Sequence, residues 1–525
     1  MPVRPNIDTL ASLPVFKEAV SRKQFLKLGG AGLGGMLLLG PAGCGVLSNE
    51  GNGAQQSLSV AYSRPIDDLD PHGASSAAEP TQLVGKNVYD TLVKREGDKI
   101  QASLATDWER PDEKTWVFTL RSGVKFHDGK QVTATDAKAS LERLAGTVEA
   151  PLAPLWESLD SVDDTDERTL TIKTKEPLGT MLPNLTLMFV LPADKLGDKG
   201  FFRKPVGSGP FKVESFVPSQ SLKLTSNADY WDGAPKLKGL EFRYIPEDST
   251  RLTSLENGEV QATWTITADQ LSQLEGNEDV ALETTTSYTY YFNWFNCSRE
   301  PFTDPNVRRA MWHAVDVEAM AKDLFLGTVE LMKAPISSSV FGYAPQEPYQ
   351  YDPERARKLL ADAGHPDGFS TTLMFSEAYG AEMRRVAETL VSYWADIGVK
   401  VEPQELEDAQ WLERLTALDW DMDVQTNATQ TGDADYSLGR LYTTEANRLG
   451  YSNKELDRIL YAARTTNDQD ERADLYAQAC EILWNDATGI YPFEVQAKYA
   501  LSSGVNGFEP APTFTPTFRT VSVEA

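Results

Sequence analysis

The chain has 525 residues, of which 41% are hydrophobic and 24% are charged, and its formal net charge is −27. This composition is typical of a globular protein and excludes a disordered or mainly membrane-spanning chain. The negative charge repels phosphate backbones, which excludes nucleic acid as a partner. The length exceeds that of one compact core and indicates two or three lobes.

The N-terminal segment has the features of an export signal. Residues 21–27 read Ser-Arg-Lys-Gln-Phe-Leu-Lys, and residues 28–48 carry no charge. The uncharged stretch is rich in glycine and only mildly apolar, which suits a signal-peptide core better than a membrane-spanning helix. The charged motif resembles the twin-arginine export motif, with Lys23 at the place of the second arginine. We therefore expect residues 1–43 to be a signal peptide.

Cys44 follows Pro41-Ala42-Gly43 directly after this stretch. Small residues before a cysteine resemble the lipoprotein processing site, where the cysteine becomes the lipid-modified N-terminus. Pro41 departs from the leucine that is usual there, and an uncleaved anchor is the alternative. Residues 44–57, rich in Gly, Ser, Asn and Gln, are predicted to form a flexible tether. The segment thus predicts a body lipid-anchored outside the cytoplasm.

The mature chain begins with strands and continues with helices and strands mixed. Alternating apolar residues predict strands at 58–63 and 116–120, and Val124 and Phe126 continue the apolar pattern after a turn. A helix is predicted to begin at Thr135 or Asp136, with apolar residues on one face.

In the second half, the pairs Asp304-Pro305 and Asp352-Pro353 each predict a helix start, an N-cap followed by proline. A further helix is predicted at 470–486 and strands at 371–375 and 399–401. The pattern predicts a mixed α/β fold.

Sequence signatures of common enzymes are absent. The chain has no G-x-S-x-G, H-E-x-x-H or G-x-x-x-x-G-K-[ST] motif, and the S-x-x-K pattern at Ser122 lacks its S-D-N and K-T-G partners. No C-x-x-C pair occurs, and the four histidines lie far apart. We expect no catalytic residue, metal or cofactor. Cys297 and Cys480 either form a disulfide or are buried free thiols.

Motifs along nearly the whole mature chain resemble the peptide/nickel class of solute-binding proteins of ABC importers, extracellular solute-binding protein family 5. The stretches that carry this resemblance are Leu69-Asp70-Pro71-His72, Val88-Tyr89-Asp90-Thr91-Leu92, Pro205-Val206-Gly207-Ser208-Gly209-Pro210-Phe211, Asn227-Ala228-Asp229-Tyr230-Trp231, Pro301-Phe302-Thr303-Asp304-Pro305 and Gly450-Tyr451-Ser452-Asn453. Each motif alone is weak, but their ordered set is specific.

The resemblance implies a two-lobed α/β periplasmic-binding-protein fold with a hinge and an extra subdomain. The first lobe would combine residues 58–88, 200–285 and 490–525, with the subdomain at 89–199 and the second lobe at 286–489. The implied activity is binding alone, with closure of the lobes around a ligand. The implied partners are a short peptide and a transmembrane permease, and the protein is expected to act as a monomer.

Residues 431–436 read Thr-Gly-Asp-Ala-Asp-Tyr, and they align with the ligand-binding place of peptide-binding relatives. The resemblance implies that Asp435 and Tyr436, beside Gly432, meet the free ammonium of a peptide. The alternative is that Asp435 only caps a turn. The sequence of residues 431–436 also resembles that of family members assigned to glutathione or very short peptides. Nickel chelates, sugars or other solutes are alternative cargoes, and an exported penicillin-binding-type enzyme or hydrolase is an alternative of another class.

Overall fold

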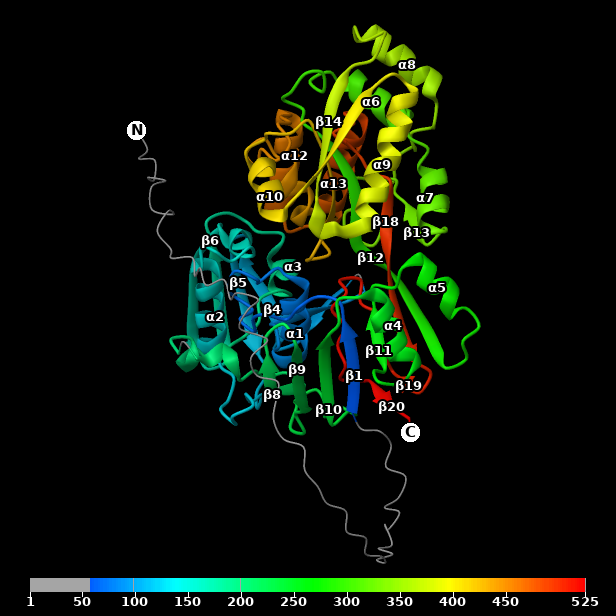
Figure 1. Ribbon diagram of the computed structural model, residues 1–525. Coiled ribbons are helices and arrows are strands. Elements are labelled where there is room, and N and C mark those ends of the chain that lie inside the picture. The colour runs from blue at the N-terminus through cyan, green and yellow to red at the C-terminus, as the bar shows by residue number, and fades with distance from the viewer. Residues whose placement is uncertain (1–56, 98, 199, 525) are drawn as a thin grey trace, which may run out of the picture. The chain divides into compact units, whose positions relative to one another are not determined.

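The computed structural model describes residues 57–97, 99–198 and 200–524 (Figure 1). Cys44, the expected signal peptide and the expected tether up to residue 56 lie outside these ranges. The described residues form helices and strands mixed along the chain, which confirms the predicted α/β class. Within these ranges no helix has the length and apolar character needed to cross a membrane.

A 12-stranded sheet runs through the described part of the chain. Its strands follow the order β15-β14-β16-β12-β18-β11-β1-β10-β9-β8, with β13 paired to β18 and β17 to β12. Their bounds are β1 (Ser57–Tyr62), β8 (Phe211–Val217), β9 (Ser221–Ser226), β10 (Gly239–Tyr244), β11 (Ala262–Trp264), β12 (Val280–Phe295), β13 (Val329–Leu331), β14 (Ser370–Ser376), β15 (Lys400–Leu406), β16 (Met422–Ala428), β17 (Gly489–Ile490) and β18 (Phe493–Ser502).

A separate four-stranded sheet has the order β4-β5-β7-β6, and two small sheets pair β2 with β3 and β19 with β20. The bounds are β2 (Val93–Glu96), β3 (Lys99–Ala102), β4 (Ala105–Asp112), β5 (Thr115–Leu120), β6 (Leu159–Asp166), β7 (Thr169–Thr174), β19 (Val505–Asn506) and β20 (Ser522–Val523). Val124 and Phe126 are buried as expected, but they lie in an irregular loop held by one bridge between Lys125 and Gln131.

The helices begin where local capping chemistry places them. Thr133 forms a capping box with Asp136 at the start of α2, and Asp304 and Asp352 cap α6 and α8 as predicted. The helices are α1 (Glu79–Val88), α2 (Ala134–Gly146), α3 (Met181–Leu185), α4 (Asp248–Glu256), α5 (Ala268–Leu274), α6 (Pro305–His313), α7 (Val317–Phe325), α8 (Pro353–Asp362), α9 (Gly380–Asp396), α10 (Asp408–Thr416), α11 (Leu438–Leu441), α12 (Lys454–Thr465) and α13 (Gln469–Asn485). Short 3₁₀ turns are η2 (Ala153–Trp156), η3 (Ala193–Lys195), η4 (Phe201–Arg203), η5 (Glu377–Tyr379) and η6 (Ala434–Tyr436).

Three large clusters of buried apolar side chains divide this part of the chain. One follows β1, β8–β11 and the C-terminal segment and defines the first lobe. A second lies on the four-stranded sheet and α2 and defines the subdomain. The third runs from β12 to the start of β18 and defines the second lobe. The residue limits drawn from the family resemblance stay a prediction.

Strands β12 and β18 connect the two lobes. From Val280 to Thr286, β12 pairs with β18, and the register then shifts between Thr286 and Tyr290. From Thr289 to Phe295, β12 pairs with β16 in the second lobe, while Tyr290 still pairs with Glu494 of β18. One long strand of the 12-stranded sheet therefore runs from one lobe into the other (Figure 1). Its pairing with β18 is irregular between Thr286 and Tyr290.

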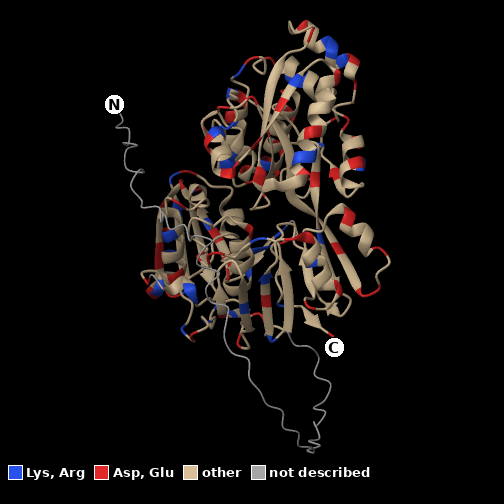
Figure 2. Ribbon diagram, viewed as in Figure 1, with Lys and Arg blue, Asp and Glu red and all other residues tan. Residues whose placement is uncertain are grey.

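Cys297 and Cys480 are both free thiols, so the structure selects this alternative over a disulfide. Burial raises the pKa of Cys297 to about 11 and that of Cys480 to about 12, which makes both thiols inert near neutral pH. Acidic positions occur on helices and strands throughout the described chain, interspersed with basic ones (Figure 2). Within the described ranges, no three His, Cys, Asp or Glu side chains gather as metal ligands.

Candidate functional site

The predicted ligand segment follows β16 and ends in the turn η6. Phe341 N–H donates to the Gly432 carbonyl at 3.0 Å, and Ala434 N–H donates to the Phe341 carbonyl at 2.9 Å. Gly432 has φ +64°, in the left-handed region that favours glycine. A Cβ on Gly432 would also lie 2.9 Å from Arg95 Nε and 3.0 Å from the Tyr288 ring. Glycine is therefore required here by backbone conformation and by close packing.

The same segment contacts the first lobe and the subdomain. Arg95 Nε, from β2, donates to the Thr431 carbonyl at 3.0 Å. Gln430 Nε2 donates to the Ala77 carbonyl, just before α1, at 3.4 Å. Tyr436 is buried within the apolar cluster of the subdomain, although it belongs to the second lobe by sequence. Gly432 and Tyr436 thus lie where the lobes touch.

Asp433 forms the innermost ion pair of this region. Arg472, on α13, donates through Nη1 and Nη2 to the two Asp433 oxygens at 3.0 and 2.8 Å. The side chains are 0% and 2% exposed for Arg472 and Asp433. Asp433 Oδ1 also accepts the Asp435 backbone N–H at 3.1 Å, so Asp433 caps the turn. The turn-capping role considered for Asp435 therefore falls on Asp433.

Asp435 lies one step closer to solvent and is less fully paired. Among the residues that the structure describes, only the Nε of Arg464, on α12, donates to its two oxygens, each at 3.1 Å. Burial raises the pKa of Asp435, the Arg464 charge lowers it, and Asp433 raises it. The Asp435 side chain is 11% exposed and that of Arg464 is 38% exposed. A further cation near this carboxylate would stabilise its ionised form.

Two further residues, Gly439 and Arg440, lie beside the Asp435–Arg464 pair, and the sequence analysis did not identify them. A Cβ on Gly439, in α11, would lie 2.4 Å from Asp435 Oδ1 and 2.5 Å from Arg464 Nη2, so only glycine leaves room for the pair. Arg440 lies over the Tyr436 ring at 4.2 Å and donates through Nε to the Tyr436 carbonyl at 3.1 Å. The Gly-Arg dipeptide after Tyr436 is the only local signal for these neighbours.

Arg464 also connects Asp435 with the subdomain. The Gly179 N–H donates to the Arg464 carbonyl at 2.8 Å. One turn earlier on α12, Tyr461 OH donates to Glu176 Oε2 at 2.6 Å. Arg464, which pairs with Asp435, therefore belongs to a helix that contacts the subdomain.

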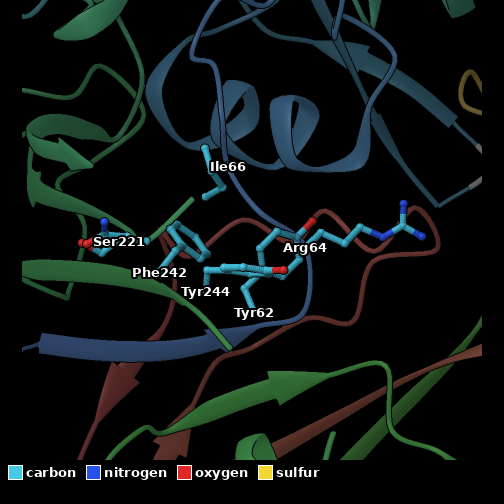
Figure 3. A pocket seen from close by; sticks show the side chains of 7 residues that line it. Tyr62, Arg64, Ile66, Ser221, Phe242 and Tyr244 are labelled. Carbon is cyan, nitrogen blue, oxygen red and sulfur yellow. The ribbon is translucent and has the colours of Figure 1, made fainter. Parts of the chain in front are cut away.

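A small hollow lies apart from this site, in the first lobe. It measures about 10 Å³, room for about one water molecule, and Tyr62, Phe242 and Tyr244 line it (Figure 3). Figure 3 shows the Arg64 side chain extending away from these rings, and its Nε lies 3.4 Å from Glu79 Oε2. The hollow is too small for a solute such as a peptide.

Comparison with known proteins places the chain in one family. Residues 99–448 match the family described as bacterial extracellular solute-binding proteins, family 5 Middle. The glutathione-binding protein GsiB of Salmonella typhimurium is 30% identical over 480 residues, which cover 87% of this chain and 92% of GsiB.

Solved structures agree with this match. DppA from Helicobacter pylori, an ABC transporter-associated periplasmic binding protein in complex with the peptide STSA, superposes with a TM-score of 0.77 at 26% identity. The alignment covers 89% of this chain and 98% of DppA. The PBP AgaA from A. tumefaciens R10, in complex with agropinic acid, gives a TM-score of 0.74 at 26% identity and covers 89% of this chain and 99% of AgaA. The comparisons confirm the family resemblance and the two-lobed fold.

Proposed function

This chain belongs to the bacterial extracellular solute-binding proteins of family 5, and we propose that its cargo is a short peptide with a free amino terminus. Its role is extracytoplasmic binding, and the family's members are binding proteins rather than enzymes. In this proposal the chain has no turnover of its own. It hands the peptide to the transmembrane permease of an ABC importer, and the glutathione-like size of the cargo follows the similarity to GsiB.

The arrangement at Asp435 is the observation that supports this cargo. A carboxylate that is 11% exposed, with a single Arg464 nitrogen on it, keeps acceptor sites for a second cation. An ammonium held there would form charge-assisted hydrogen bonds, which are about twice as strong as neutral ones. Gly432 and Tyr436 lie at the lobe contact on either side of the turn, so a ligand at Asp435 would be close to both lobes.

The test compares ligands rather than variants. Mass spectrometry identifies any solute that remains bound after purification, and calorimetry then measures glutathione and alanine peptides of two to five residues. We expect the free peptides to bind and their N-acetylated forms to bind at least tenfold more weakly, because acetylation removes the ammonium charge. Equal affinity of the free and acetylated forms would show that the ammonium is not recognised. Binding of sugars or nickel chelates alone would reject the peptide proposal.

We also propose that ligand binding closes the lobes about β12 and β18. A ligand shifts such an equilibrium only by its differential affinity for the two states. Contacts such as Arg95–Thr431 and Gly179–Arg464 are those that a closed state would gain. Small-angle scattering with a saturating peptide should give a smaller radius of gyration than without it. Superimposable profiles would argue against this motion.

The export part of the proposal concerns residues outside the described ranges. Cleavage after residue 43 and lipidation of Cys44 would tether a monomeric receptor close to its permease. Cys44→Ala should release the protein from membranes or block its maturation, as fractionation and mass spectrometry of the N-terminus would detect. Unchanged membrane association with a different N-terminus would reject the lipid anchor.

A further inference from the structure

Lys86 is a half-buried cation, and within the described ranges the hydrogen-bond partners of its Nζ are uncharged. It lies on α1, and its Nζ donates to Thr513 Oγ1 at 3.1 Å and to Thr515 Oγ1 at 2.8 Å. Among the described residues no carboxylate forms an ion pair with Lys86. A buried charge without a counter-charge is costly, so natural structures retain one where something else balances it.

The surroundings of Lys86 increase that cost. Burial and, to a smaller extent, the positive charge of Arg95 together lower the pKa of Lys86 to about 8. The two threonine hydroxyls also contact each other, with 2.6 Å between their Oγ1 atoms. An ammonium and a guanidinium close to hydroxyl groups are the donors that recognise a carboxylate.

Lys86 lies close to the candidate peptide site. Arg95, its charged neighbour, donates to the Thr431 carbonyl. Tyr288 N–H donates to the Pro512 carbonyl at 3.0 Å, next to Thr513, and the Tyr288 ring packs against Gly432. The C-terminal segment, which accepts the hydrogen bonds of Lys86, and the loop that carries Asp435 therefore meet around Arg95 and Tyr288.

We propose that Lys86, with Thr513 and Thr515, is a subsite for a carboxylate of the cargo. The inference rests on the proposed peptide function and deepens it, because Asp435 would receive the ammonium and Lys86 the negative end. The two sites together select a zwitterionic solute with a free carboxylate over a purely cationic or neutral one. The substrate class of this proposal is therefore short peptides with an unblocked C-terminus.

The experiment measures two forms of one ligand on three proteins. The tightest binder among glutathione and the alanine peptides is prepared as the free acid and as the C-terminal amide. Calorimetry then measures both forms on the parent, on Lys86→Met and on Lys94→Met. Lys94 is the matched control, since it is a partly exposed lysine on the neighbouring strand β2 with Glu96 2.8 Å from its Nζ. Thermal melting checks that each variant is folded.

We expect the parent and Lys94→Met to prefer the acid by about 10- to 100-fold, the size of a hydrogen bond to a charged group. Lys86→Met should bind both forms with affinities within about twofold, close to that of the parent for the amide. Equal binding of acid and amide to the parent, or a preference retained in Lys86→Met, would reject the carboxylate subsite and leave the peptide function intact. Where Lys86→Met does not fold, equal binding of the acid and the amide to the parent would still reject the subsite. Absence of binding by every peptide would reject the function and the subsite together.

Discussion

Asp433 and Asp435 lie two residues apart in one turn, yet their surroundings differ. Asp433 receives both terminal nitrogens of a fully buried Arg472 and also a backbone N–H. Asp435 receives one nitrogen of Arg464, a side chain that is 38% exposed. A carboxylate has about four acceptor sites, and those of Asp433 are much closer to saturation. The comparison teaches that burial alone does not mark a ligand-binding carboxylate, because unused acceptor capacity near solvent is also needed.

The largest effect is expected from removal of the inner arginine. Arg472→Met leaves Asp433 as a buried charge without a partner, which typically costs about 3–5 kcal/mol. Urea unfolding should show a loss of this size. Arg464→Met is the matched control and should lose much less, since its side chain is partly solvated. Similar losses in the two variants would contradict the distinction between the pairs.

Asp423, on β16, allows a comparison with Asp433 and Asp435, because in the described part of the chain no Lys or Arg pairs with it. Trp411 Nε1 donates to it at 2.7 Å, but burial prevails and raises its pKa from 3.8 to about 7. The folded state therefore holds this proton more tightly than the unfolded state. Its contribution to stability is full below about pH 4 and is lost as the pH rises to about 7.

At about 1.4 kcal/mol per pKa unit, this loss approaches about 4 kcal/mol. Asp423→Asn keeps an uncharged side chain at every pH and should lack this part of the pH dependence. Urea unfolding of both proteins at pH 4.5, 6 and 8 measures the difference. Parallel stability profiles would show that Asp423 ionises normally in the fold.

Removal of the outer carboxylate should affect binding more than stability. Asp435→Asn is expected to weaken peptide binding about 30-fold to several thousand-fold, the range for truncating one member of a buried charge pair. Calorimetry measures the loss, and thermal melting should show a change smaller than that of Arg472→Met. Unchanged affinity would assign Asp435 a structural role like that of Asp433.

The smallest effect is expected at Gly439, the residue of α11 that packs against the Asp435–Arg464 ion pair. Gly439→Ala places a Cβ against Asp435 Oδ1 and Arg464 Nη2, so both side chains must move. We expect a destabilisation of about 1–3 kcal/mol, the cost of overpacking, and a weaker peptide affinity. Gly146→Ala is a matched control, because no atom lies within 4 Å of its added Cβ. Equal behaviour of the two variants would show that the outer pair has room to shift.

The sequence predicts the parts of this fold whose causes are local. The N-caps at Asp304 and Asp352 lie next to the prolines and apolar faces of their own helices, so a short window is sufficient. The partners of Asp433 and Asp435 lie 39 and 29 residues further on, on two different helices, and no spacing rule joins them. The sequence alone left a turn cap as the alternative role for Asp435, and only the fold shows that Asp433 forms this cap. Lys86 and Thr515 are 429 residues apart, so their contact required the fold.

The long strand β12 indicates how a fluorescent sensor of ligand binding could be built from this protein. Its pairing is regular on both sides of the shift between Thr286 and Tyr290, so in the proposed closure we expect bending to be concentrated in those few residues. Two lobes that bend only there and at the facing residues of β18 would move relative to each other along close to one coordinate. One pair of fluorophores, placed on α4 and α7 so that each lobe carries one, would then convert occupancy into an optical signal. In the proposed closure, the receptor would report the binding of its solute as a change in the distance between the two labels.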